Sequence, residues 1–255
     1  MFTALLTACI VAAPAAPAPV AVDVSVGAGA AQRGLTRLAD PMTPRASPRP
    51  AAALDLAMTT AGQIADRPET WLYGHLAYAT SLGMVAREQL IGGALRAASG
   101  RTQRAAIQLG ARFEPTRLRG RFAPGLALGY SLRPWTSDRA LVTPWSLHHG
   151  PSVLIPLLAR LPAARLAVRV TPELGLLARH GGLSGAQVRR IGVLIAGELA
   201  VEVRLHRRVA VGVAYREAHG LFDAVDPRLV LDHERFVIAR VTFTAGLPAQ
   251  KDRTP

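Results

Sequence analysis

Charged side chains in four long stretches of this sequence are confined to alternate positions. The stretches are 104–114, 121–133, 165–179 and 192–206, and within each one every Arg, Asp, Glu or Lys has the same parity. In the last two stretches these residues are Arg165, Arg169, Glu173 and Arg179, and then Glu198, Glu202 and Arg204. Successive side chains of a β-strand point to opposite faces, whereas the same charges would scatter around a helix. The pattern therefore predicts amphipathic strands.

The length of these strands distinguishes a membrane protein from a soluble sandwich. They run for about 11 to 15 residues, longer than the usual five or six, and so suit a tilted crossing of a bilayer. Between the charges the polar face carries Gly, Ala and Ser, which suit a narrow interior. We therefore expect an all-β, antiparallel, up-and-down transmembrane β-barrel with its apolar face outward and its charges inward.

The rest of the pattern predicts about eight strands and alternating connections. The expected strands are 70–84, 102–114, 120–133, 148–161, 164–179, 188–206, 209–221 and 235–247. The connections 85–101, 134–147 and 222–234 are long, 180–187 is of medium length, and 115–119, 162–163 and 207–208 are short. Long loops at one end and short turns at the other are typical of outer-membrane barrels. If Val22–Gly29 and Leu54–Ala61 also cross, the barrel has ten strands.

The N-terminus predicts export. Residues 1–22 carry no charged side chain, 2–13 are apolar, and Ala13-Pro14-Ala15 offers a cleavage site. A signal peptide over 1–21 is therefore expected, although its usual positive start is missing. Cys9 is the single cysteine and is interpreted as part of the signal core, with a lipidated cysteine as the alternative.

The sequence divides into four parts on this interpretation. After the signal peptide, 22–69 is an N-terminal segment that forms either a linker or extra strands. The barrel covers 70–247, and 248–255 is a C-terminal tail.

The formal net charge of +13 comes almost entirely from arginine, since Lys251 is the one lysine. The arginines are scattered singly, whereas nucleic-acid binders gather their charge on one face or in one run. The expected partners are therefore outer-membrane lipid, lipopolysaccharide and the barrel-assembly machinery, and not nucleic acid.

Seven charged residues are expected to point into the lumen: Arg165, Arg169, Glu173, Glu198, Glu202, Arg204 and Arg240. In a narrow barrel opposite charges would pair across strands and plug the interior. The alternative is a narrow pore that prefers anions. Four aromatic residues near strand ends, Trp71, Trp135, Trp145 and Tyr215, are expected at the membrane interfaces.

The residues offer little catalytic chemistry. His148 and Ser152 share a parity, as a serine hydrolase would require, but no acid lies near them in the sequence. The acidic stretch 222–234 is interpreted as a solvated loop, with divalent-ion binding as the alternative. No catalytic residue, metal site or cofactor is expected.

The pattern over 70–247 resembles the small eight-stranded outer-membrane barrels of the OmpA-like and OmpW-like class. The resemblance implies the outer membrane of a Gram-negative bacterium and a structural or surface-interaction role, or a small nonspecific pore. The alternatives are a lipid-acting enzyme of the lipopolysaccharide deacylase or acyltransferase type, and a soluble periplasmic barrel that binds an apolar ligand. In that class the last strand commonly ends the chain with an aromatic residue. This chain departs from that pattern, because eight residues follow its last expected strand.

Overall fold

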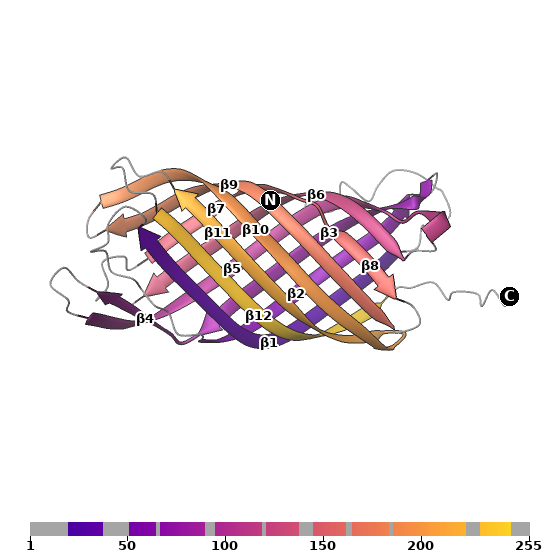
Figure 1. Ribbon diagram of the computed structural model, residues 1–255, viewed down its shortest axis with the longest axis horizontal. Coiled ribbons are helices and arrows are strands. Elements are labelled where there is room, and N and C mark those ends of the chain that lie inside the picture. Colours follow the sequence, from indigo (N-terminus) through magenta and orange to yellow (C-terminus); the bar gives the residue numbers. More distant parts are fainter. Residues whose placement is uncertain are drawn as a thin grey trace.

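The computed structural model is an antiparallel sheet that closes on itself (Figure 1). It describes residues 20–37, 51–64, 67–89, 95–118, 121–137, 145–161, 165–183, 186–222 and 230–245. The strands are β1 (Val20–Arg37), β2 (Ala51–Ile64), β3 (Arg67–Leu82), β4 (Met84–Gln89), β5 (Leu95–Phe113), β6 (Phe122–Ser137), β7 (Trp145–Leu154), β8 (Leu157–Leu161), β9 (Leu166–Leu183), β10 (Ala186–His206), β11 (Val209–Phe222) and β12 (Val230–Ala245). The first strand pairs with the last over sixteen register positions, Val22↔Ala245 to Arg37↔Val230.

The barrel has ten crossings in the described part of the chain, because two of them are interrupted. β3 and β4 both pair with β5 and are separated at Gly83, whose positive φ of 68° favours glycine. β7 and β8 both pair with β6 and β9 and are separated at Ile155 and Pro156. The prediction of eight strands is therefore wrong, and the ten-strand alternative is confirmed, with β1 and β2 as the additional pair.

The barrel wall begins earlier in the chain than expected. β1 starts at Val20 and β2 occupies 51–64, so two strands lie in the segment that was left open as linker or extra strands. The strands also extend into the predicted loops, since β5 begins at Leu95 and β12 at Val230. Residues 1–19 and 246–255 lie outside the described residues, and with them Cys9, the C-terminal tail and all of the expected signal peptide except Val20 and Ala21, which belong to β1.

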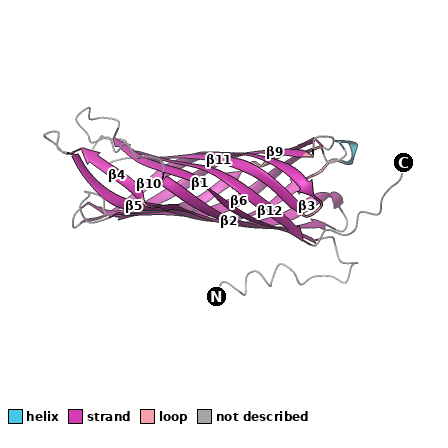
Figure 2. Ribbon diagram, turned by 90° about the horizontal axis from the view of Figure 1, so that it is seen from below, coloured by secondary structure: helices cyan, strands magenta, loops and turns pink. Residues whose placement is uncertain are grey.

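The two ends of the barrel differ, and we name them by their connections. At the outer end the strands are joined by 38–50, 90–94, 138–144, 184–185 and 223–229. At the turn end they are joined by 65–66, 114–121, 162–165 and 207–208, and the first and last strands have their free ends there. Figure 2 shows β4 at the outer end and a short 3-10 helix, Thr116–Leu118, at the turn end. No helix among the described residues is long and apolar enough to span a membrane.

The outer surface of the barrel is apolar. Along β10 the side chains of Val193, Ile195, Leu199, Val201, Val203 and Leu205 are all exposed. Along β6 the exposed side chains are Leu126, Leu128, Tyr130 and Leu132. In a barrel, side chains that are exposed on the outside face the surrounding solvent, and an apolar band of this kind requires lipid. The predicted orientation, with apolar residues outward and charges inward, is confirmed.

Candidate functional site: the charged lumen

A buried layer of polar side chains crosses the outer half of the lumen. We call it the outer network, and it consists of Arg33, Thr102, Arg133, His148, Asp232 and Glu234. The side chains of its five ionisable members are at most 3% exposed. They come from β1, β6, β7 and β12, which are far apart in the chain.

Arg33 is the centre of the outer network. Its Nε and Nη2 donate to Oδ1 and Oδ2 of Asp232 at 3.1 and 3.0 Å, which is a bidentate ion pair. Its Nη1 donates to Thr102 Oγ1 at 3.2 Å and to the Pro134 carbonyl at 3.3 Å. Its Nη2 also lies 3.1 Å from His148 Nδ1. One side chain therefore reaches from β1 to β5, β6 and β7.

The remaining members extend this layer around the wall. Thr102 Oγ1 donates to Glu234 Oε1 at 2.7 Å, and Arg133 Nε donates to Glu234 Oε2 at 2.9 Å. Asp232 Oδ2 lies 2.7 Å from His148 Nδ1. The two arginines balance the two carboxylates, which is the condition under which charges can stay buried.

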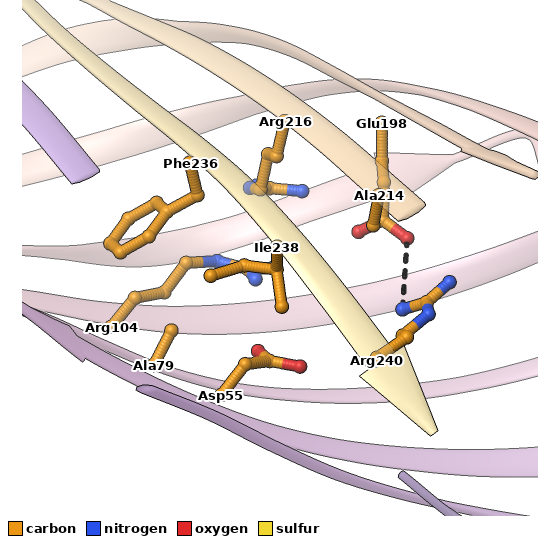
Figure 3. A pocket seen from close by; sticks show the side chains of 9 residues that line it. All are labelled: Asp55, Ala79, Arg104, Glu198, Ala214, Arg216, Phe236, Ile238 and Arg240. Carbon is orange, nitrogen blue, oxygen red and sulfur yellow. Dashed lines mark ion pairs between the residues drawn. The ribbon is translucent and has the colours of Figure 1, made fainter. Parts of the chain in front are cut away.

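A second layer, the inner network, lies nearer the turn end. It consists of Arg104, Arg169, Arg216, Arg240, Asp55, Glu173, Glu198 and Glu202. As in the outer network, the numbers of arginines and acids are equal, here four of each. Arg216 Nη2 donates to Glu173 Oε2 at 2.5 Å, and Arg169 Nη2 donates to Glu198 Oε1 at 3.1 Å. Arg240 lies 3.1 Å from Glu202 and 3.9 Å from Glu198. Figure 3 shows Arg240 and Glu198 side by side in the lining of a cavity, with a dashed line that marks their ion pair.

The structure places five of the seven predicted lumen residues in the inner network: Arg169, Glu173, Glu198, Glu202 and Arg240. Arg165 and Arg204 lie outside the inner network, and their predicted orientation into the lumen stays a prediction. Arg165 precedes β9 in a turn with φ 53° and is exposed. Arg204 is exposed at the turn end of β10, where the pairing with β11 shifts register. Both residues lie too close to the turns to reach the enclosed part of the lumen.

The interfacial aromatic residues are placed differently from the prediction in two cases. Trp135 is 7% exposed and packs inside the barrel with Met84 and Phe236. Trp71 has the same parity as the inward Ala79 of β3 and is half-buried at the turn end. Tyr215 is on the outer surface, where its hydroxyl donates to Glu217 at 2.5 Å. The side chain of Trp145 lies outside the described residues.

Apolar side chains complete the filling of the outer half. Leu177, Leu194 and Phe222 pack together there, and the Phe222 ring centroid lies 4.8 Å from that of His148. The lumen is therefore filled by a mixture of ion pairs and hydrophobic residues, where the sequence pattern predicted charges and small residues alone.

The structure does not assemble the hydrolase that His148 and Ser152 suggested. Ser152 Oγ donates to Glu173 at 2.8 Å, one layer below His148. An acid does contact His148, namely Asp232, but the imidazole is fully buried and its Nε2 has no hydrogen-bond partner among the described residues. A substrate has no access to this ring.

The sequence analysis missed four members of the outer network: Arg33, Arg133, Asp232 and Glu234. Asp232 and Glu234 were assigned to a solvated acidic loop, but they belong to β12 and are buried. A signal was present, because both share the even parity of Arg240. Extending the last strand toward the N-terminus by parity would have found them.

Comparisons with known proteins concern the fold alone. No family model matches the sequence, and no curated protein matches it. Among solved structures, the outer membrane protease OmpT from Escherichia coli has a TM-score of 0.48 at 9% identity, covering 91% of this chain and 99% of OmpT. The outer membrane protein OprG from Pseudomonas aeruginosa has a TM-score of 0.40 at 12% identity, covering 90% and 97%. Neisserial surface protein A has a TM-score of 0.33 at 10% identity, covering 90% and 99%.

Proposed function

We propose that the chain is an outer-membrane β-barrel of the Gram-negative type, and that it is a closed barrel with a structural or surface-interaction role. The observation that carries this proposal is that the Arg33 side chain reaches across the whole width of the lumen. In the ring of ten, β1 and β7 are five strands apart in either direction, so they stand opposite each other. A side chain of β1 nevertheless lies 3.1 Å from one of β7.

The free-energy cost of opening the outer network supports a permanently closed lumen. Opening this layer would separate the Arg133–Glu234 pair, which joins β6 to β12 across the lumen and is out of contact with water, and it would break the contact of Arg33 with His148. Breaking a buried pair costs about 3–5 kcal/mol when one charge is left uncompensated. An open state would therefore be rare at equilibrium. A small nonspecific pore is the less favoured role, because the carboxylates of the outer network are paired with its arginines and close this layer.

Planar-bilayer recordings test the proposal. The folded wild-type protein should give no steady conductance at moderate voltage. The double variant Arg33→Ala, Arg133→Ala removes the two side chains that cross the lumen, and it should conduct in frequent steps. A matched control is Arg235→Ala, which removes an exposed guanidinium from the outer surface. Regular conductance steps from the wild-type protein would favour a pore and refute the closed barrel.

The proposal includes the absence of lipid hydrolysis. It is supported by the burial of His148 and by the hydrogen bond that Ser152 makes with Glu173. Purified protein should release no fatty acid from lipopolysaccharide. Release by the wild type that His148→Ala abolishes would show that this part of the proposal is wrong.

A further inference from the structure

The inner network surrounds a cavity that its own ion pairs do not fill. The cavity has an empty volume of about 320 Å³, including the solvent to which it opens. Its lining consists of Asp55, Ala79, Arg104, Glu198, Ala214, Arg216, Phe236, Ile238 and Arg240 (Figure 3). Three guanidinium groups and two carboxylates therefore face one space, and one of the three guanidinium groups, that of Arg216, has its carboxylate partner Glu173 outside the lining.

Arg104 has no ion-pair partner among the described residues. It is 6% exposed, and its Nε makes no hydrogen bond there. Figure 3 shows its guanidinium directed into the cavity, between Arg216 and Asp55. An arginine stays charged at any ordinary pH, so this charge cannot be removed by deprotonation. A buried charge without a partner is costly, and something must offset it.

The carboxylates nearest to Arg104 are bound to other side chains. Glu173 binds Arg216 and Ser152, and Glu198 binds Arg169. Asp55 and Arg104 both pair with Ala79 of β3, from opposite sides. Their Cα atoms are therefore separated by two strand spacings, roughly 10 Å. Among the described residues no carboxylate lies within 4 Å of the Arg104 guanidinium, and Glu173, Glu198 and Glu234 attract it only from a longer distance.

In the described part of the chain, the exposed side chains around the cavity lie toward the turn end. The side chains of the outer network are at most 3% exposed, whereas those of Glu198, Glu202 and Arg169 are 20, 29 and 32% exposed. These last three lie on the turn-end parts of β9 and β10. In an outer-membrane barrel the short turns face the periplasm. The part of the lumen between the outer network and the turn end is thus a vestibule that the outer network closes at one side and that opens to the periplasm at the other.

We propose that this vestibule binds a small anion, of the size of chloride or phosphate, between Arg104, Arg216 and Arg240. The anion supplies the acceptor that Arg104 lacks, and it accepts hydrogen bonds from guanidinium groups directed at the cavity. The unpaired Nε atoms of Arg216 and Arg240 point to the same shortage of acceptors. The apolar side of the cavity, Phe236 and Ile238, limits the ligand to a small ion with few waters.

Calorimetric titration tests this site on the folded barrel in detergent. Inorganic phosphate is added at constant ionic strength, and chloride is titrated separately. We expect saturable binding of at least one of them. Arg104→Gln should weaken it roughly tenfold or more, since a hydrogen bond to a charged group is lost together with the charge.

The matched control is Arg112→Gln, which removes a lumenal arginine of the same strand. Arg112 already pairs with Glu114 at 2.8 Å and does not line the cavity. Its affinity for the anion should equal that of the wild type, and heat-modifiability on a gel shows whether each variant is folded. Absence of saturable binding for both ions, or equal binding by folded Arg104→Gln, would overturn the proposal. Neither result depends on conductance, so this site and the closed barrel can fail separately.

Discussion

Arg33 on β1 and His148 on β7 meet inside the lumen, with Nη2 and Nδ1 3.1 Å apart, although their strands face each other across the ring. Asp232 on β12 contacts both of them. The contacts of one arginine thus tie together the wall on both sides of the barrel. Loss of these buried polar interactions should therefore lower the stability of the barrel as well as raise its permeability.

Removal of Arg33 should therefore destabilise the barrel strongly. Arg33→Ala leaves Asp232 buried without its partner, and we expect a loss of about 3–5 kcal/mol in the free energy of unfolding. Urea unfolding in lipid vesicles measures this loss. Arg235→Ala, which breaks an exposed pair with Glu217, should cost less than about 1 kcal/mol. Equal losses in the two variants would show that the outer network adds little to stability.

A charge on the lipid-facing surface should be costly in proportion to its depth. Leu199 and Leu205 lie on the same outer face of β10, the first further from the turn end than the second. We expect Leu199→Arg to cost about 2–4 kcal/mol and Leu205→Arg about 0–1 kcal/mol, because the charge near the turn reaches the interface. Unfolding in vesicles is again the measurement. Two small and equal costs would mean that water, rather than lipid, covers this face.

The packing of Trp135 inside the barrel makes Gly100 intolerant of a side chain. A Cβ at Gly100 would collide with the indole ring of Trp135. Gly100→Ala should cost about 1–3 kcal/mol and change the fluorescence of Trp135, measured with Trp71 and Trp145 replaced by Phe. Gly197→Ala is the control, since a Cβ there meets nothing within 4 Å. An unchanged Trp135 spectrum in Gly100→Ala would place this indole elsewhere.

Cysteine cross-linking can verify the ten-strand closure. Val24 and Phe243 are register partners on the outer face of β1 and β12. In a Cys9→Ala background, Val24→Cys with Phe243→Cys should form an intramolecular disulfide on oxidation, which changes mobility on a non-reducing gel. Val24→Cys with Leu76→Cys should not, because β2 lies between them at roughly 10 Å. An eight-strand barrel without β1 would give no Val24–Phe243 cross-link.

Parity predicted the faces of the strands well because it depends only on local backbone geometry. It separated Leu199 from Glu198 and Leu174 from Glu173 correctly. It would also have placed Trp135 inside, because this residue shares the odd parity of Arg133. Nearness to a strand end was the weaker guide, since it says nothing about which face a side chain occupies.

The ion pairs themselves were beyond the reach of a local pattern. Arg33 and Asp232 are 199 positions apart, and their contact depends on the register of a seam that joins the two ends of the chain. Parity gives the face of a residue but not its height in the barrel. The strand number was missed for a related reason, because small residues such as Gly27 and Ala31 fill the inner face of β1 and leave few charges to mark it.

The seam between β1 and β12 also bears on the timing of folding. Its register partners run from Arg37 with Val230, 193 positions apart, to Val22 with Ala245, 223 positions apart, and the Ser25 and Thr242 hydroxyls meet at 2.8 Å between them. Contacts of such long range form slowly, because much chain entropy must be lost before any of them is made. A ribosome must release nearly the whole polypeptide before the ring can close. Until then the first strand has an unpaired edge, which is open to pairing with other chains.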